Sequence, residues 1–347
     1  MMRKITVIAI ISLMMVGLFA VLPRISEADE SITVTDARGE TVTFDTPPER
    51  IISFMPSNTE MLFYIGEGDR VVGVDDFSDY PSEVEDLPTV GDSFSVDYEN
   101  ITELEPDVVV TPSFNTQMID KLEEIGHQVV ATNSNTLEDV YTDMKLLGTM
   151  CGIQEEVEEM ADDLEDEMNE ITQNTADLPR EDRVDIFYIA SVGPIYTPGN
   201  NTFQNTLIQN AGGNNIADQE DDWWEMSKET IIDEDPEIII ATEGLEDQVE
   251  NLTEDEVWQG ISAVENDEIY YVNDDIFSRP APRVVEAQST LVDITREHLD
   301  IDENGQDDNG QEDNEEDVPG FTLPILLMSI AITFTILIKD KRNKRDD

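Results

Sequence analysis

A twelve-residue pattern occurs twice in this chain and constrains its fold more than any other feature. The first copy is ENITELEPDVVV, residues 99–110, and the second is ETIIDEDPEIII, residues 229–240. Both read Glu-x-Ile-x-acid-x-acid-Pro-acid followed by three β-branched residues, and the copies are 130 residues apart. A proline at this place ends a helix and precedes a strand. The chain is therefore predicted to contain two related halves, each with a helix that leads through proline into a central strand.

Strands and helices alternate in both halves, which is typical of parallel sheets. Ser57 and Glu60 open one helix with the spacing of a capping box. The predicted strands are 50–54, 71–74, 107–111, 127–132, 183–190, 237–242 and 268–273, with further helices at 115–126 and about 282–299. The predicted fold class is α/β, with two Rossmann-like lobes joined by a single long backbone helix.

The backbone helix is expected over residues 153–173, IQEEVEEMADDLEDEMNEITQ. Its apolar residues recur at intervals of three and four, which places them on one face of an otherwise acidic helix. They are Ile153, Val157, Met160, Leu164, Met168 and Ile171. We interpret this segment as a stiff strut packed across both lobes, which leaves a ligand cleft between them.

Composition excludes several classes of function. The net charge of −61 repels nucleic acid. Because the acids are spread along the whole chain, we favour adaptation to high salt over a single unusually acidic protein. The one cysteine, Cys151, is expected to be buried and inert. Two histidines, His127 and His298, give little material for a metal cluster or a catalytic triad, and His127 is interpreted as structural.

The amino-terminal end is predicted to be a secretory signal over residues 1–28. MMRK precedes an apolar run from Ile5 to Val21, and small and polar residues follow up to Ala28. The apolar run is also long enough for an uncleaved anchor.

The carboxyl-terminal end combines three features. Residues 301–318 are an acidic linker, Pro319 to Phe321 reads PGF, and an apolar run to Ile338 precedes KDKRNKRDD. Eighteen residues from Phe321 at ~1.5 Å each span roughly 27 Å, close to a bilayer core. Residues 319–347 resemble the PGF-type sorting signal of archaeal surface proteins, in which an archaeosortase replaces the tail with a lipid. The alternative is a single-pass anchor, and both tether the body outside the cell.

Two further signals are weaker. Secretion would make Asn100, Asn200 and Asn251 candidate glycosylation sites, since each begins an Asn-x-Thr sequon. The linker also resembles a calcium loop, but Gln311 replaces its bidentate glutamate, so we favour a disordered linker.

The body of the chain resembles the solute-binding proteins of ABC importers whose lobes share one backbone helix, and in particular vitamin B12-binding proteins. The boundaries would be an N-terminal lobe at 31–135, a helical linker at 137–178 and a C-terminal lobe at 183–300. The segments that carry the resemblance are RIISFMPSNTEMLFYIG (50–66), DFSDYP (76–81), GPIYTPGNNTFQNTLIQNAGGNNI (193–216), DDWWEMSKETI (221–231) and FSRPAPRV (277–284).

The resemblance implies a metal chelate as ligand, a cobalt corrinoid or an iron chelate, with no cofactor and no metal site of the protein's own. Glutamates on the two lobe tips, here Glu99 and Glu229, would dock by meeting arginines of the importer's membrane subunits. The implied ligand residues are Ser57, Asn58, Tyr80, Phe114, Trp223, Trp224, Phe277, Arg279 and Arg283. Aromatic walls would bury a corrin face, and the arginines would pair with a ligand carboxylate or phosphate.

A corrinoid receptor is our first hypothesis, and an iron–siderophore or haem receptor is the alternative. A secreted metal-dependent hydrolase is a distant third, because the sequence has no nucleophile elbow and no histidine-rich ligand spacing. A purely structural surface protein would not need paired lobes with aromatic loops. We expect a monomeric protein that is not an enzyme, with modest lobe closure because the connecting helix is stiff.

Overall fold

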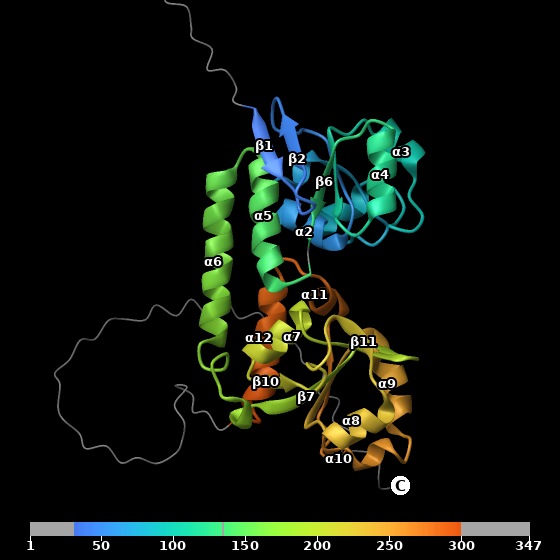
Figure 1. Cartoon of the computed structure of the whole chain (residues 1–347), viewed down its shortest axis with the longest axis vertical. Coiled ribbons are helices and arrows are strands. Elements are labelled where there is room, and N and C mark those ends of the chain that lie inside the picture. The colour runs from blue at the N-terminus through green and yellow to red at the C-terminus, as the bar shows by residue number, and fades with distance from the viewer. Residues whose placement is uncertain (1–30, 134, 300–347) are drawn as a thin grey trace, which may run out of the picture. The chain divides into compact units, whose positions relative to one another are not determined.

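The structure is a computed structural model, which describes residues 31–133 and 135–299. Figure 1 shows the two halves of the chain, and each half contains one four-stranded parallel sheet. The N-terminal sheet has the order β4-β3-β5-β6, from Val71–Val74, Ile51–Ser53, Val108–Pro112 and Val129–Thr132. The C-terminal sheet has the order β10-β7-β12-β13, from Gly213–Asn215, Val184–Ile189, Ile238–Thr242 and Ile269–Val272. The predicted α/β class with two lobes is confirmed.

The repeated pattern occupies the same place in both lobes. Helix α3 (Tyr98–Glu103) leads into β5, and helix α8 (Lys228–Glu234) leads into β12. Each of these strands is third in its sheet, between two parallel neighbours. The repeat therefore builds the central strand of each lobe, as the sequence predicts.

The two copies also agree in backbone detail. Glu105 and Asp235, the residues before each proline, both adopt φ of 45°. After the proline, the Asp107 amide donates to the Arg50 carbonyl at 2.8 Å, and the Glu237 amide donates to the Asp185 carbonyl at 2.9 Å. The side chains of these two acids also accept hydrogen bonds: Asp107 accepts from the Arg50 amide, and Glu237 accepts from the Asp185 amide. These paired contacts fix the register of both central strands.

Further elements cover the two sheets. In the first lobe they are the hairpin β1 (Ile32–Thr35) and β2 (Thr41–Phe44), helices α2 (Pro56–Tyr64) and α4 (Thr116–Glu124), and short 3-10 turns at Gly68–Arg70 and Ser82–Asp86. In the second lobe they are strands β8 (Ser191–Val192), β9 (Ile195–Pro198) and β11 (Trp223–Glu225), helices α7 (Phe203–Asn210), α9 (Glu246–Thr253), α10 (Ser262–Glu265) and α11 (Asp274–Ser278), and 3-10 turns at Arg180–Asp182, Glu243–Leu245 and Trp258–Gly260.

A long helix runs along one side of both lobes (Figure 1). Helix α6 (Gln154–Thr172) packs against α5 (Leu137–Cys151) of the first lobe and α12 (Val284–Arg296) of the second. Its predicted apolar stripe faces inward, with Val157, Leu164 and Met168 buried. Gly148 lets α5 approach closely, because a Cβ there would lie 2.6 Å from the Cβ of Val157. The strut is thus part of one core cluster that includes residues from both sheets.

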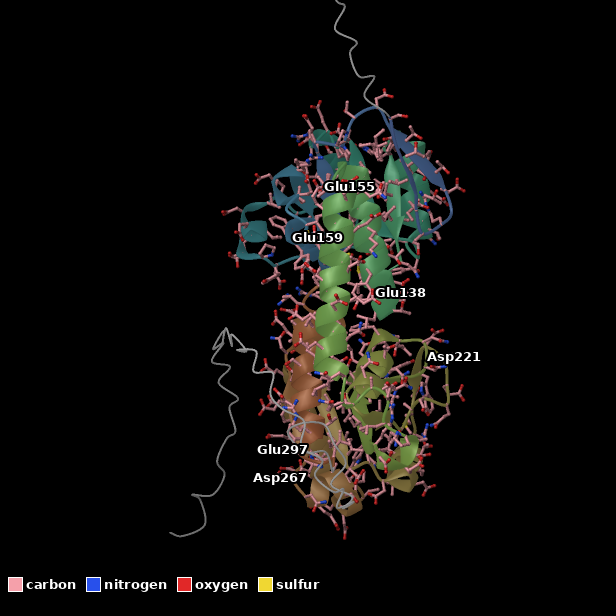
Figure 2. All side chains as sticks on the ribbon, turned by 90° about the vertical axis from the view of Figure 1, so that its left-hand side faces the viewer. Glu138, Glu155, Glu159, Asp221, Asp267 and Glu297 are labelled. Carbon is pink, nitrogen blue, oxygen red and sulfur yellow. The ribbon has the colours of Figure 1, made fainter. Side chains whose placement is uncertain are left out.

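The opposite face of α6 carries the acids. Figure 2 shows acidic side chains over this face, among them Glu155 and Glu159. An acidic outer face on a helix whose other face is buried is the amphipathic pattern that the sequence predicts.

The predicted capping box at Ser57 and Glu60 is wrong: α2 begins at Pro56 after Met55, without a side-chain cap, and Glu60 binds arginines instead. The buried, inert Cys151 is confirmed, since burial raises the pKa of its thiol to about 12.

The predicted signal, acidic linker and sorting segment lie outside the described residues. Within the described ranges, no helix is both long and apolar enough to cross a bilayer.

Candidate functional site

The carboxyl ends of the two parallel sheets face each other across the lobes. Arg279 follows α11, which comes after β13, and its Nη1 donates to Asp79 Oδ1 at 2.7 Å, in the loop after β4. The Phe203 amide, at the start of α7, donates to the Asn135 carbonyl, after β6, at 3.1 Å. In doubly wound α/β sheets, ligands bind outside the carboxyl ends of the strands. This edge is therefore the candidate site.

The first lobe presents aromatic side chains at this edge. They lie in three loops, 75–81, 91–96 and 113–115, and their exposed fractions are 62% for Phe77, 44% for Tyr80, 99% for Phe94 and 61% for Phe114. Tyr80 and Phe114 were predicted from the sequence, but Phe77 and Phe94 were missed. The signal that could have found Phe77 is its position directly after strand β4, whereas no strand directly precedes the loop of Phe94.

Hydrogen bonds tie these three loops together. The Asp76 amide donates to the Gly91 carbonyl at 3.0 Å, and Asn115 Nδ2 donates to Ser93 Oγ at 2.9 Å. Gly91 has φ of 81°, and a Cβ there would lie 2.0 Å from the Ser95 carbonyl oxygen, so only glycine fits this turn. The exposed rings therefore stand on loops with a defined mutual arrangement.

The second lobe contributes an antiparallel sheet in the order β11-β9-β8. Trp223 and Trp224 are consecutive in β11, so their side chains point to opposite faces. Trp223 is 45% exposed. Trp224 packs against the core of its lobe, and its Nε1 donates to the Ala217 carbonyl at 3.2 Å. Of the two predicted tryptophans, Trp223 is the more accessible.

A buried glutamate joins the two lobes. Glu60 lies on α2 with only 2% of its side chain exposed. Its Oε2 accepts Arg283 Nε at 2.8 Å, and its Oε1 accepts Arg283 Nη2 at 2.7 Å. Arg279 Nη1 donates to the same Oε1 at 3.2 Å. Both arginines belong to the second lobe, so this cluster bridges the two halves.

The arginines of this cluster were predicted to contact ligand, and the structure gives them protein partners. Arg279 also pairs with Asp275, Nη2 to Oδ1 at 2.6 Å. The Arg283 guanidinium lies 3.8 Å from the centroid of the Tyr80 ring. Burial by itself lowers the pKa of both guanidinium groups, but hydrogen bonds to Asp79 and Glu60 outweigh it, and the pKa of both is raised. Both side chains stay charged at any physiological pH.

Three other predicted ligand residues are buried. Phe277 is 1% exposed and belongs to the core cluster, so as placed it has no surface to offer a ligand. Ser57 and Asn58 are also buried. Asn58 Nδ2 donates to the Phe54 carbonyl at 2.8 Å, whereas the Ser57 hydroxyl has no partner within the described residues.

Two hollows lie outside the facing edges. One, of about 470 Å³, is lined by residues of β2, α4 and β6 in the first lobe, including His127. The other, of about 290 Å³, lies between α5, α6 and α7. None of the predicted ligand residues lines either hollow. Within the described residues, no cluster of His, Cys, Asp or Glu could hold a metal ion.

The predicted docking glutamates occupy matched positions. Glu99 and Glu229 are exposed in the first turns of α3 and α8. The first turn of a helix favours a negative charge, because the amide dipoles point toward it. Figure 1 shows the two helices at opposite ends of the paired lobes.

The three sequon amides are each hydrogen-bonded. Asn100 Nδ2 donates to the Thr89 carbonyl at 2.7 Å, and Asn251 Nδ2 donates to the Asp247 carbonyl. The Asn200 amide contacts Asp221 Oδ1 at 3.4 Å. Glycosylation at these positions stays a prediction.

Two α/β lobes that face each other across aromatic loops, and share one packed helix, define a two-lobed solute receptor. The chain belongs to the periplasmic binding protein family, whose model matches residues 51–276. Proteins of this family bind solutes outside the cytoplasm and are not enzymes.

Three relatives show how far this likeness extends. The ABC transporter substrate-binding lipoprotein YvrC of Bacillus subtilis, described as uncharacterized, is 29% identical over 76% of this chain and 84% of its own. The vitamin B12-binding protein of Vibrio cholerae is 29% identical over 70% of this chain and 87% of its own. Its crystal structure matches with a TM-score of 0.63 over 72% of this chain and 98% of its own, at 26% identity. A structure from Staphylococcus epidermidis, described as a possible iron-binding periplasmic protein, matches with a TM-score of 0.64 over 72% of this chain and 99% of its own, at 29% identity.

Proposed function

We propose that this protein is the substrate-binding protein of an ABC importer, and that it captures a corrinoid of the cobalamin type between its two lobes. The observation that carries the proposal is the set of exposed aromatic side chains on one edge of the first lobe, opposite a second lobe that exposes Trp223. The similarity to a vitamin B12-binding protein over 70% of the chain supports the same ligand class.

The chemistry of a corrin suits this edge. Its ring is a broad, partly apolar face fringed by neutral amides, and aromatic side chains bury such a face well. Each square ångström of apolar surface removed from water contributes about 25 cal/mol. Phe77, Phe94 and Phe114 have no side-chain hydrogen-bonding group, so their exposure in the free protein is best accounted for by an apolar ligand face.

An iron–siderophore or haem receptor is the alternative, and the relative described as possibly iron-binding favours it. Many siderophores and haem carry carboxylates or other anionic groups, which a receptor usually meets with arginine. Here both arginines at the facing edge already pair with carboxylates of the protein. This difference supports the corrinoid over the anionic chelates.

Delivery to the importer would use Glu99 and Glu229. Two equal charges on matched helices can orient the receptor on a partner with two-fold symmetry. The packing of α6 against both lobes supports a receptor whose lobes close only slightly on ligand. The receptor would work at the cell surface, held by its carboxyl-terminal segment or by a lipid that replaces this segment.

The test is calorimetric titration of the purified chain, in molar salt, with cobalamin, cobinamide, haemin and ferric siderophores. We expect the tightest binding with a corrinoid. Binding of a ferric siderophore or haemin, with no corrinoid bound, would establish the alternative. Binding of none of these compounds would contradict the proposed function.

A further inference from the structure

Glu60 uses both of its carboxylate oxygens on arginines of the opposite lobe. Arg283 forms a two-pronged contact with it, through Nε at 2.8 Å and Nη2 at 2.7 Å. This geometry matches the planar fork of a guanidinium to a carboxylate, which is the arrangement with which arginine also binds anionic ligands. The side of Arg283 best suited to an anion is therefore already occupied.

The remaining surface of Arg283 is also covered in part. Its guanidinium stacks on the Tyr80 ring at 3.8 Å, and such stacking fixes the plane of the group. Within the described residues, Glu60 is the one acid in ion-pair contact with Arg283. The availability of Arg283 for a ligand thus depends on Glu60.

Arg279 contacts three carboxylates of the protein. Its nearest oxygens belong to Asp275 at 2.6 Å, Asp79 at 2.7 Å and Glu60 at 3.2 Å. Two positive and three negative side chains give the whole cluster a formal charge of −1. A ligand that approaches this edge meets a cluster with no surplus positive charge.

We infer that Glu60 determines the charge class of the ligand: by holding Arg283, and by sharing Arg279, it makes the facing edges select neutral or cationic chelates over anionic ones. The inference rests on the proposed function, and it names Glu60 as a specificity residue that acts through the two arginines. The site should therefore bind chelates whose surface facing the second lobe carries no free carboxylate or catecholate group.

The physical reason is the cost of separating the pair. To reach Arg283, a carboxylate of the ligand must displace a buried carboxylate that already makes two short hydrogen bonds, and it leaves Glu60 with only the longer contact to Arg279, at 3.2 Å. A buried charge that loses most of its hydrogen-bond partners is strongly unfavourable. Removing the charge of Glu60 has the reverse effect, because it leaves Arg283 in need of an anion. Since the pair is buried, molar salt screens it less than it screens surface charges.

The test compares two chelates of opposite charge, aquocyanocobinamide as the cation and haemin as the dianion from its propionates. Their affinities are measured by titration for the wild-type full chain and for Glu60→Gln. We expect the wild type to prefer the cation, and we expect Glu60→Gln to shift the affinity ratio at least tenfold toward haemin. The double variant Glu60→Gln with Arg283→Met should lose this gain, because the released guanidinium is gone.

A purely structural role for Glu60 would lower the affinity for both chelates by the same factor and leave the ratio unchanged, and that result would overturn the inference. If Glu60→Gln fails to fold, Arg283→Met alone gives the test, since it leaves the cluster more negative and should move the ratio further toward the cation. An unchanged ratio there would also overturn it. If the wild-type chain binds no chelate at all, the proposed function itself fails, and the inference falls with it.

Discussion

The two lobes share a frame but differ at the edges that face each other. In both, a short helix leads through proline into the third strand of a four-stranded parallel sheet. At the facing edges, the first lobe carries aromatic loops and Glu60, whereas the second carries the added sheet β11-β9-β8 and the two arginines. The lobes are alike where α3 and α8 lie and unlike where the ligand is proposed to bind.

This difference suggests that the matched helices serve docking to the importer and the diverged edges serve ligand binding. A partner with two-fold symmetry favours two matched surfaces, and the repeat provides them at Glu99 and Glu229. A single asymmetric ligand favours two different surfaces, and the diverged loops provide those.

The largest effect is expected from reversing both docking charges, Glu99→Arg with Glu229→Arg. Import should fall to background, because like charges then meet the arginines expected on the importer, while ligand affinity should stay within about twofold. Uptake into proteoliposomes that contain the importer measures the first quantity, and titration calorimetry measures the second.

The matched control for this prediction lies on the same two helices. Glu103→Arg with Asp233→Arg reverses two exposed acids that are also 130 residues apart. Import should be largely retained in this control. Full import by the Glu99 and Glu229 variant, or equal loss in both variants, would argue against docking by these two residues.

The shared frame predicts equal stability losses at equivalent core positions. Ile101 and Ile231 are both fully buried in the repeat. Replacing either with alanine should destabilise the protein by about 2–5 kcal/mol, and the two values should agree within roughly 1 kcal/mol if the packing is truly duplicated. Denaturant unfolding in molar salt measures both. A large loss at one position with little at the other would mean that the copies differ in packing.

Substitution of the exposed aromatic residues on the facing edges should lower the affinity for the ligand and leave docking to the importer unchanged. Trp223→Ala and Phe114→Ala should each weaken corrinoid binding by about tenfold, since a well-placed aromatic contact contributes on the order of 1 kcal/mol beyond its buried area. Tyr64→Ala is the control, because Tyr64 is exposed at the end of α2 and is not in these loops. Unchanged affinity in both variants would remove the aromatic edges from the site.

The smallest effect concerns Asp75, a buried carboxyl at the start of the aromatic loop 75–81. Burial raises its pKa, although the hydroxyl of Ser78, at 2.5 Å, partly offsets this. The folded protein thus holds the proton to higher pH than the unfolded chain, so the contribution of Asp75 to stability declines as pH rises through its raised pKa. Asp75→Asn should remove that decline. Thermal unfolding of both proteins between pH 4 and 7 tests it, and parallel curves would contradict the expectation.

Much of the frame could be predicted because it depends on local patterns. The strand at 71–74 coincides with β4, and the helix expected over 153–173 became α6 at Gln154–Thr172. Apolar periodicity and proline position are short-range signals, and the duplicated segment doubled their weight. The predicted placement of Glu99 and Glu229 on matched helices depended on the same repeat.

The facing edges were harder to predict because they depend on contacts between distant residues. Glu60 fitted a capping box by spacing, yet its partners Arg279 and Arg283 are more than 200 residues away. Phe277 resembled a ligand aromatic in the sequence but lies in the core. Strands β8, β9 and β11 are short and carry polar residues, so periodicity gave no sign of them.

Hydrogen exchange of the full chain, with and without bound cobalamin, tests most directly the claim that unlike edges hold the ligand while like helices stay free. We predict that amides in loops 75–81, 91–96 and 113–115 and in strand β11 exchange more slowly with ligand, and that those of α3 and α8 do not change. Slower exchange in α3 and α8, with none in the three loops or β11, would contradict this claim.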